Sequence, residues 1–165
     1  MCNIGFMQGR LSPIIEGKIQ CFPWGYWKNE FEIAKRIKIN LMEWTLDHEE
    51  LYKNPLMTKK GRKIIKDLIK DNKICIPSLT GDCFMQKPFW KETNKSVIKN
   101  LRRDFIDVCR AASSVGIKYI VVPLVDNGSI ENKIQEEKLI SFLKENENIF
   151  LDLDISIIFE SDKNP

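Results

Sequence analysis

The stretch ISIIFE at residues 155–160 is apolar almost throughout and ends on a carboxylate, Glu160. A short apolar run of this kind is typical of a strand that is covered on both faces of a sheet. Four similar runs precede it in the chain: NIGFMQ (3–8), NLMEWTL (40–46), KICIPSL (73–79) and KYIVVPLV (118–125). The five runs together predict a buried β-sheet.

Helical patterns fill the intervals between these runs. The clearest is NKSVIKNLRRDFIDVCRAASSVG (94–116), whose apolar residues recur at helical spacing and which ends at Gly116, a typical helix stop. The other three are NEFEIAKRIKI (29–39), with Asn29 as its expected N-cap, GRKIIKDLIKDN (61–72) and IENKIQEEKLISFLKENEN (130–148). Five strands that alternate with four helices predict an α/β fold with a parallel sheet and right-handed crossovers.

Two folds fit this order, a doubly wound open sheet and a (β/α)₈ TIM barrel. A nucleotide-binding doubly wound sheet usually has a glycine-rich turn after its first strand, and Gly5 and Gly9 do not form one. The segments after the second and third strands are long, as in barrels that build their site from such loops. These loops favour the barrel, but a whole barrel has eight βα units and about 250 residues, whereas this chain shows five strands and four helices, so both folds remain open from the patterns alone.

The composition fits one folded domain over residues 1–165. Net charge is +3, from 26 basic and 23 acidic residues, which argues against a nucleic-acid partner. The sequence shows no signal peptide and no apolar run long enough for a membrane span, and its five cysteines form no C-x-x-C pair. We expect reduced thiols, a cytoplasmic location and no membrane partner.

Polar residues recur where the strands are expected to end, and such ends share one rim in a parallel barrel. Carboxylates on one rim repel each other unless a cation or a substrate lies between them, and oxygen-rich sites suit Mg²⁺ or Mn²⁺. Each residue also has a structural interpretation as a turn former, a helix cap or an ion-pair partner. The candidates are Gln8, Arg10, Glu43, Asp47, Ser78, Thr80, Asp82, Asp126, Asn127, Glu160 and Asp162.

Four of these candidates are the predicted site residues. Glu160 is the strongest, because it ends its strand directly, and Glu43 is next, because a charge within an apolar run needs a partner. Arg10 could bind a substrate phosphate or pair with a carboxylate, and Asp82 could bind substrate or simply begin its loop. His48, the only histidine, is expected at the surface. The aromatic segment CFPWGYW (21–27) walls a pocket, covers the barrel mouth or packs against the first helix.

The chain resembles the sugar phosphate isomerases and epimerases of the xylose-isomerase-like TIM barrel superfamily. The resemblance runs along essentially the whole chain, through IGFMQGRLSP (4–13), FPW (22–24), PSLTGDCFMQKPF (77–89), VVPLVDNGSI (121–130) and FESD (159–162). It implies an enzyme of carbohydrate metabolism that moves a proton on the carbon next to a carbonyl. A divalent metal, Mn²⁺ or Mg²⁺ with Zn²⁺ as the alternative, assists that step in the family.

The resemblance carries one metal ligand over to this chain, Glu160, which in epimerases of the family also helps to move the proton. Arg10, Glu43 and Asp82 are the expected substrate-binding residues. The remaining ligands belong to strands six to eight, which have no counterpart here, so we expect a barrel truncated after strand five. We expect such an N-terminal fragment to be inactive alone, to bind metal weakly and to self-associate through its open sheet edges.

Three functions therefore remain open from the sequence. The first is the isomerase or epimerase, with a sugar or sugar phosphate as the small-molecule partner. The second is a non-catalytic remnant or interaction module of the same fold. The third is an abasic-site endonuclease, which the single His48 and the weak net charge disfavour. Whether the chain alone is an enzyme stays undecided at this point.

Overall fold

The computed structural model describes residues 4–14 and 21–162 of the chain. Five strands form one parallel sheet in the order β1-β2-β3-β4-β5, so each strand lies beside its neighbours in the sequence. This order is that of consecutive βα units in a barrel and not of a doubly wound sheet, whose strand order reverses at a switch point. The strands are β1 (Gly5–Met7), β2 (Leu41–Thr45), β3 (Cys75–Thr80), β4 (Tyr119–Pro123) and β5 (Ser156–Glu160).

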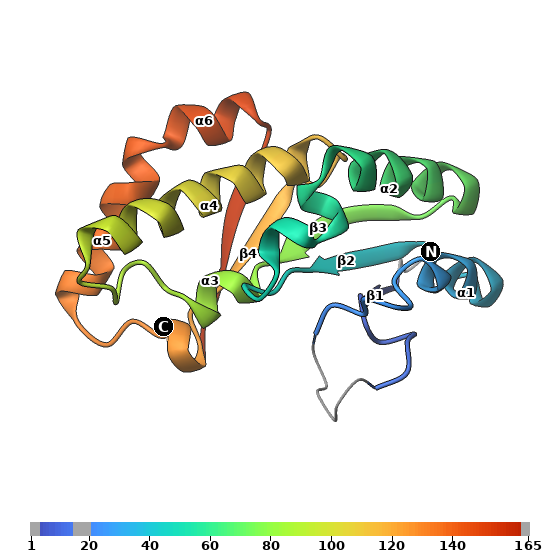
Figure 1. Cartoon of the computed structure of the whole chain (residues 1–165), viewed down its shortest axis with the longest axis horizontal. Coiled ribbons are helices and arrows are strands. Elements are labelled where there is room, and N and C mark those ends of the chain that lie inside the picture. The colour runs from blue at the N-terminus through green and yellow to red at the C-terminus, as the bar shows by residue number, and fades with distance from the viewer. Residues whose placement is uncertain (1–3, 15–20, 163–165) are drawn as a thin grey trace.

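Six helices lie between the strands in the described residues, where the sequence predicted four. The two additions are short: α3 (Asp82–Gln86) follows β3, and α6 (Glu147–Asp152) continues the crossover of α5 (Lys133–Glu145). The others are α1 (Asn29–Ile37), α2 (Lys59–Asn72) and α4 (Lys95–Ser113), and single 3₁₀ turns lie at Leu51–Lys53, Pro55–Met57 and Asp126–Gly128. In Figure 1, α2, α4, α5 and α6 lie along one side of the sheet.

Side-chain caps begin some of the helices but not the first one. Asn94 caps α4 by accepting hydrogen bonds from the amides of Ser96 and Val97, and Thr58 caps α2 in the same way. Asn29 was expected to cap the first helix, and this is wrong: Lys28 is the N-cap, without a side-chain bond, and Asn29 is the first helical residue. Gly116 lies three residues beyond the end of α4 with a φ of 91°, which suits a glycine.

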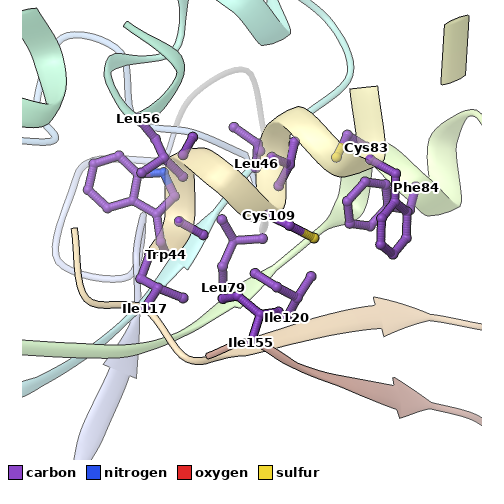
Figure 2. Close-up of a cluster of buried hydrophobic side chains, with 14 of the residues drawn as sticks. Trp44, Leu46, Leu56, Leu79, Cys83, Phe84, Cys109, Ile117, Ile120 and Ile155 are labelled. Carbon is purple, nitrogen blue, oxygen red and sulfur yellow. The ribbon is translucent and has the colours of Figure 1, made fainter. Parts of the chain in front are cut away.

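The core lies between the sheet and the helices. Alternate strand residues point to this layer, among them Trp44, Leu79 and Ile120, all of them 0% exposed. Phe105 and Cys109 of α4 are equally buried and pack against them from the helical side, as Figure 2 shows for Cys109. The near-continuous apolar runs thus mark strands of a parallel sheet, but only one face of that sheet is covered by helices.

The sheet is open at both edges within the described residues. β1 pairs with β2 alone and β5 pairs with β4 alone, so the five strands do not close into a ring. Apolar side chains of β5 are left partly uncovered: Ile158 is 42% exposed and Phe159 is 45% exposed. An incomplete barrel was the expectation, and the open five-stranded sheet confirms it.

Candidate active site

The face of the sheet opposite the helices carries the polar candidates on β2 and β3. Glu43 is paired in register with Ser78, and its carboxylate accepts hydrogen bonds from the Ser78 hydroxyl at 2.7 Å and the Thr80 hydroxyl at 2.8 Å. Its strand neighbours Met42 and Trp44 point the other way, into the core. Glu43 is therefore a half-buried, hydrogen-bonded carboxylate inside the curve of the barrel.

Glu160 lies on the same face as Glu43. In the strand pairing, Glu43 lies beside Ser78, Ser78 beside Tyr119, and Tyr119 beside Ser156. Glu160 is four residues after Ser156, and side chains an even number of residues apart in a strand point to the same face. Glu160 is the last residue of β5, and it is exposed. Within residues 4–14 and 21–162 its carboxylate makes no hydrogen bond or ion pair, and β3 and β4 separate it from Glu43.

Asp82 and Arg10 differ sharply in burial. Asp82 is 5% exposed and begins α3, directly after the Gly81 N-cap. Burial is the main cause that raises the pKa of the Cys83 thiol. The negative charges of Asp82 and Asp47 raise it further. Arg10 is exposed in the turn after β1, where its amide donates to the Met7 carbonyl at 3.1 Å.

Gln8 and Glu30 hold the turn that carries Arg10. Gln8 is 1% exposed, and its side-chain oxygen accepts from the Thr45 amide at 3.3 Å, so it extends the pairing of β1 with β2. Glu30 of α1 is 0% exposed and accepts from the amides of Gly9 at 2.9 Å and Leu11 at 3.0 Å. Burial raises the pKa of Glu30, and these amide bonds partly oppose the rise.

The role of Glu30 was not predicted from the sequence. It lies on a helix at a position that looks like an ordinary acidic first turn. No signal in the sequence marks it, since Asn29 before it and Glu32 after Phe31 are polar as well. Glu30 is a positioning residue, because it fixes the backbone of the loop that presents Arg10.

A second network ties three βα loops together at the carboxyl end of the sheet. Asp47 accepts from the Phe22 amide at 2.9 Å and from the Gln86 side chain at 2.8 Å, and Gln86 in turn accepts from the His48 amide at 2.7 Å. Asn127, after β4, donates its side-chain amide to the carbonyl of Gln86 at 3.2 Å. Short α3 is thus the common anchor of the loops after β1, β2 and β4.

The aromatic segment 21–27 packs against α1, as one of its interpretations expected, since the rings of Trp27 and Phe31 lie 6.5 Å apart, and it also packs against the core. Phe22 and Trp27 are 1% and 7% exposed, and their rings lie 5.6 and 5.9 Å from that of Trp44. Trp24 and Tyr26 are 43% and 44% exposed, so the segment also presents two aromatic side chains to solvent. The segment is therefore a packed cover over β2 whose outer rings remain accessible.

His48 and the cysteines take no part in a metal cluster. His48 is half-buried, against the expected surface position, and burial lowers its pKa although Asp104 opposes the change. Cys75, Cys83 and Cys109 are free thiols, Cys21 is half-buried, and Cys2 lies outside the described residues. No three His, Cys, Asp or Glu side chains of residues 4–14 and 21–162 are grouped to hold a metal ion. None of the helices in these ranges has the length and hydropathy of a membrane span.

Comparison with known proteins places the fold. No protein-family profile and no curated protein matches the chain in sequence. A xylose isomerase domain protein from Planctomyces limnophilus matches its structure with a TM-score of 0.64 at 10% identity, over 99% of this chain and 55% of that one. A D-psicose 3-epimerase from Clostridium cellulolyticum H10, solved with D-tagatose, matches with a TM-score of 0.61 at 14% identity, over 79% of this chain and 45% of that one.

A 3-keto-D-glucoside 4-epimerase from E. coli matches with a TM-score of 0.63 at 14% identity, over 96% of this chain and 56% of that one. The chain spans about half the length of these solved structures. At such low identity the likeness shows the fold alone, a TIM barrel, of which the described residues form five strands.

Proposed function

We propose that this chain, which has the fold of the xylose-isomerase-like barrels, provides part of the active site of a metal-dependent sugar or sugar-phosphate isomerase or epimerase. The observation that carries the proposal is the position of Glu160, an exposed carboxylate at the carboxyl end of β5 on the same face as Glu43. Barrel enzymes build their active sites at this end of the strands. The neighbours that act on sugars support the class by analogy of fold.

Glu160 is assigned the proton transfer. A carboxylate that substrate can reach is suited to take a proton from the carbon next to a carbonyl and to return one. Glu43 is assigned to a substrate hydroxyl, because Ser78 and Thr80 hold its carboxylate in one orientation. Exposed Arg10 is assigned to an anionic group such as a phosphate, and Asp82 to a hydroxyl at the end of β3.

A divalent metal, when bound in such a site, would polarise the substrate carbonyl. Glu160 has the oxygen chemistry that Mn²⁺, Mg²⁺ or Zn²⁺ accepts, but the described residues add no further ligands beside it. These residues do not complete a metal site. We propose that the chain alone binds such ions weakly. Saturable binding of Mn²⁺ at micromolar concentration in a calorimetric titration would contradict this proposal.

Substrate binding can be tested without turnover. D-tagatose and D-fructose, the sugars found with the matched epimerases, are titrated into ¹⁵N-labelled chain and followed by amide chemical shifts. We expect shifts in the turn at Arg10, at Glu43, and at the ends of β3 and β5. Glu160→Gln should weaken them, whereas the control Glu136→Gln, on an exposed part of α5, should not. Shifts elsewhere, or none, would refute the assigned site.

Catalysis by the chain alone is a separate question. An assay of Mn²⁺-dependent exchange of the ketose C3 proton with deuterated solvent should show no rate above background, because the metal site is incomplete. Clear exchange by the purified chain would overturn the proposed inactivity. Sugar binding without exchange would favour the second candidate, a non-catalytic module of the same fold. The observation in favour of this candidate is that the described residues contain no cluster of metal ligands.

A further inference from the structure

The two open sheet edges differ in what surrounds them. Strand β5 ends the sheet on one side with half-exposed Ile158 and Phe159, and β1 ends it on the other, next to Ile4, which is 65% exposed. A strand at a sheet edge has backbone groups that can pair with another strand. Both edges are therefore surfaces that can accept a further parallel strand.

Charge is distributed unevenly between the two edges. The segment 145–162, which includes β5, contains six acidic residues and no basic one: Glu145, Glu147, Asp152, Asp154, Glu160 and Asp162. Two of these are partly neutralised by ion pairs, Glu145 with Arg102 and Asp154 with Lys118. The remaining acidic side chains make the β5 edge negative.

The opposite end of the molecule is basic. Residues 28–38 and 59–73, which contain α1 and α2, carry eleven Lys or Arg and four Asp or Glu. No ion pair between side chains involves these two segments in the described part of the chain. Figure 1 shows α1 at one end of the structure and α5 and α6 at the other. The chain as a whole has a net charge of only +3, so the asymmetry is not visible in its composition.

We propose that a second copy of this chain docks head to tail, with the β5 edge of one copy paired to the β1 edge of the next. This arrangement continues the parallel pairing seen between β4 and β5 and places the acidic edge beside the basic end. Pairing of two β5 edges would bring two acidic segments together, which opposes association. A head-to-tail contact is heterologous, so it either closes into a ring or propagates.

The inference rests on the sheet edges and the charges, and it is independent of the proposed sugar site. Attraction between exposed charges is screened over about 8 Å at physiological salt. Head-to-tail association should therefore weaken as salt is added. Association driven by apolar contact alone would be insensitive to moderate salt or strengthened by it.

Sedimentation velocity of the full chain, over a range of protein concentrations, tests the proposal. At about 50 mM NaCl we expect species of at least twice the 19.3 kDa of one chain, with at least a tenfold weaker association at about 500 mM. A monomer at every concentration and both salt levels would overturn the proposal. So would association that becomes stronger with salt.

Matched variants locate the contact. Ile158→Lys should weaken association at least tenfold, because it places a positive charge on the acidic β5 edge that meets the basic end of the next copy. Ile140→Lys on α5 is the control, since Ile140 is 41% exposed and Ile158 is 42% exposed. Far-ultraviolet circular dichroism of both variants should equal that of the parent chain. An equal loss of association in both would refute docking at the β5 edge.

Charge reversal distinguishes the two possible pairings. Reversal of the acidic edge, by Glu147→Lys with Asp152→Lys, should weaken head-to-tail association but would strengthen pairing of two β5 edges. Reversal of the basic end, by Arg36→Glu with Lys70→Glu, should also weaken it. A chain with all four changes should associate again, because opposite charges then meet once more. Failure of that recovery in a folded chain would contradict the proposal.

Discussion

Gly61 occupies a position in α2 where local propensity and tertiary packing predict opposite effects. Gly61→Ala would ordinarily stabilise a helix by about 1 kcal/mol, since glycine has more backbone freedom to lose. In the structure an added Cβ at residue 61 would lie 2.1 Å from the Pro55 carbonyl oxygen and 2.5 Å from the Pro55 Cα. Both are backbone atoms, so relief requires the 3₁₀ turn at Pro55–Met57 to move away from α2.

The magnitude follows from these two terms. Overpacking of a closely packed contact typically costs about 1–3 kcal/mol, and an approach of 2.1 Å to a backbone atom belongs at the upper end, about 2–3 kcal/mol. The propensity gain of about 1 kcal/mol offsets part of this cost. We expect the free energy of unfolding of Gly61→Ala to fall by about 1–2 kcal/mol. Urea unfolding followed by circular dichroism, at one fixed protein concentration, measures it.

Gly25→Ala is the matched control, because no atom lies within 4 Å of the position of its added Cβ. Its free energy of unfolding should stay within about 0.5 kcal/mol of the parent value. A Gly61→Ala chain as stable as the parent, or more stable, would show that α2 and the preceding turn are not packed as described.

Two further predictions concern caps and buried carboxylates. Thr58→Ala should lower the free energy of unfolding by about 1 kcal/mol, because the Thr58 hydroxyl accepts from the Gly61 amide at 2.9 Å, whereas Thr58→Ser should keep most of it. Burial raises the pKa of Glu30 above its ordinary value of 4.5, so the folded chain holds this proton more tightly than the unfolded chain. The contribution of Glu30 to the free energy of unfolding is then fully present below pH 4.5 and is lost as pH rises through the raised pKa. Glu30→Gln should remove that pH dependence in unfolding measurements, whereas Glu30→Ala should cost about 1–3 kcal/mol by leaving the amides it binds unpaired. An unchanged pH profile in Glu30→Gln would contradict the assignment.

Sequence patterns predicted the strands well because apolar runs report burial directly. The run 155–160 contains β5 at Ser156–Glu160, and the run 40–46 contains β2 at Leu41–Thr45. Short α3 was missed, because five residues are too few to show helical periodicity. The predicted range 61–72 ends at the last residue of α2, whereas the predicted range 29–39 runs two residues past the end of α1, because Lys38 adopts the left-handed conformation without the glycine that normally signals it.

The site was predicted less completely than the fold. Glu43, Asp82 and Glu160 were identified by their place at or near strand ends, and their assigned roles remain predictions. Gln86 carried no signal, although it connects Asp47 to His48 across 39 and 38 residues of sequence. Contacts over such separations depend on how strands lie side by side, which local patterns do not encode.

The sequence by itself determined the alternation of strands and helices, the positions of the strands and the carboxylate that ends the last one, because burial and periodicity are local properties of the chain. Only the tertiary structure decided that Ser78 and Thr80 hold Glu43, that Glu30 binds the loop after β1, and that acidic and basic segments lie at opposite ends of an open sheet. The physical reason is the same in each case: the strand order and register bring residues together, or keep them apart, regardless of their separation along the chain.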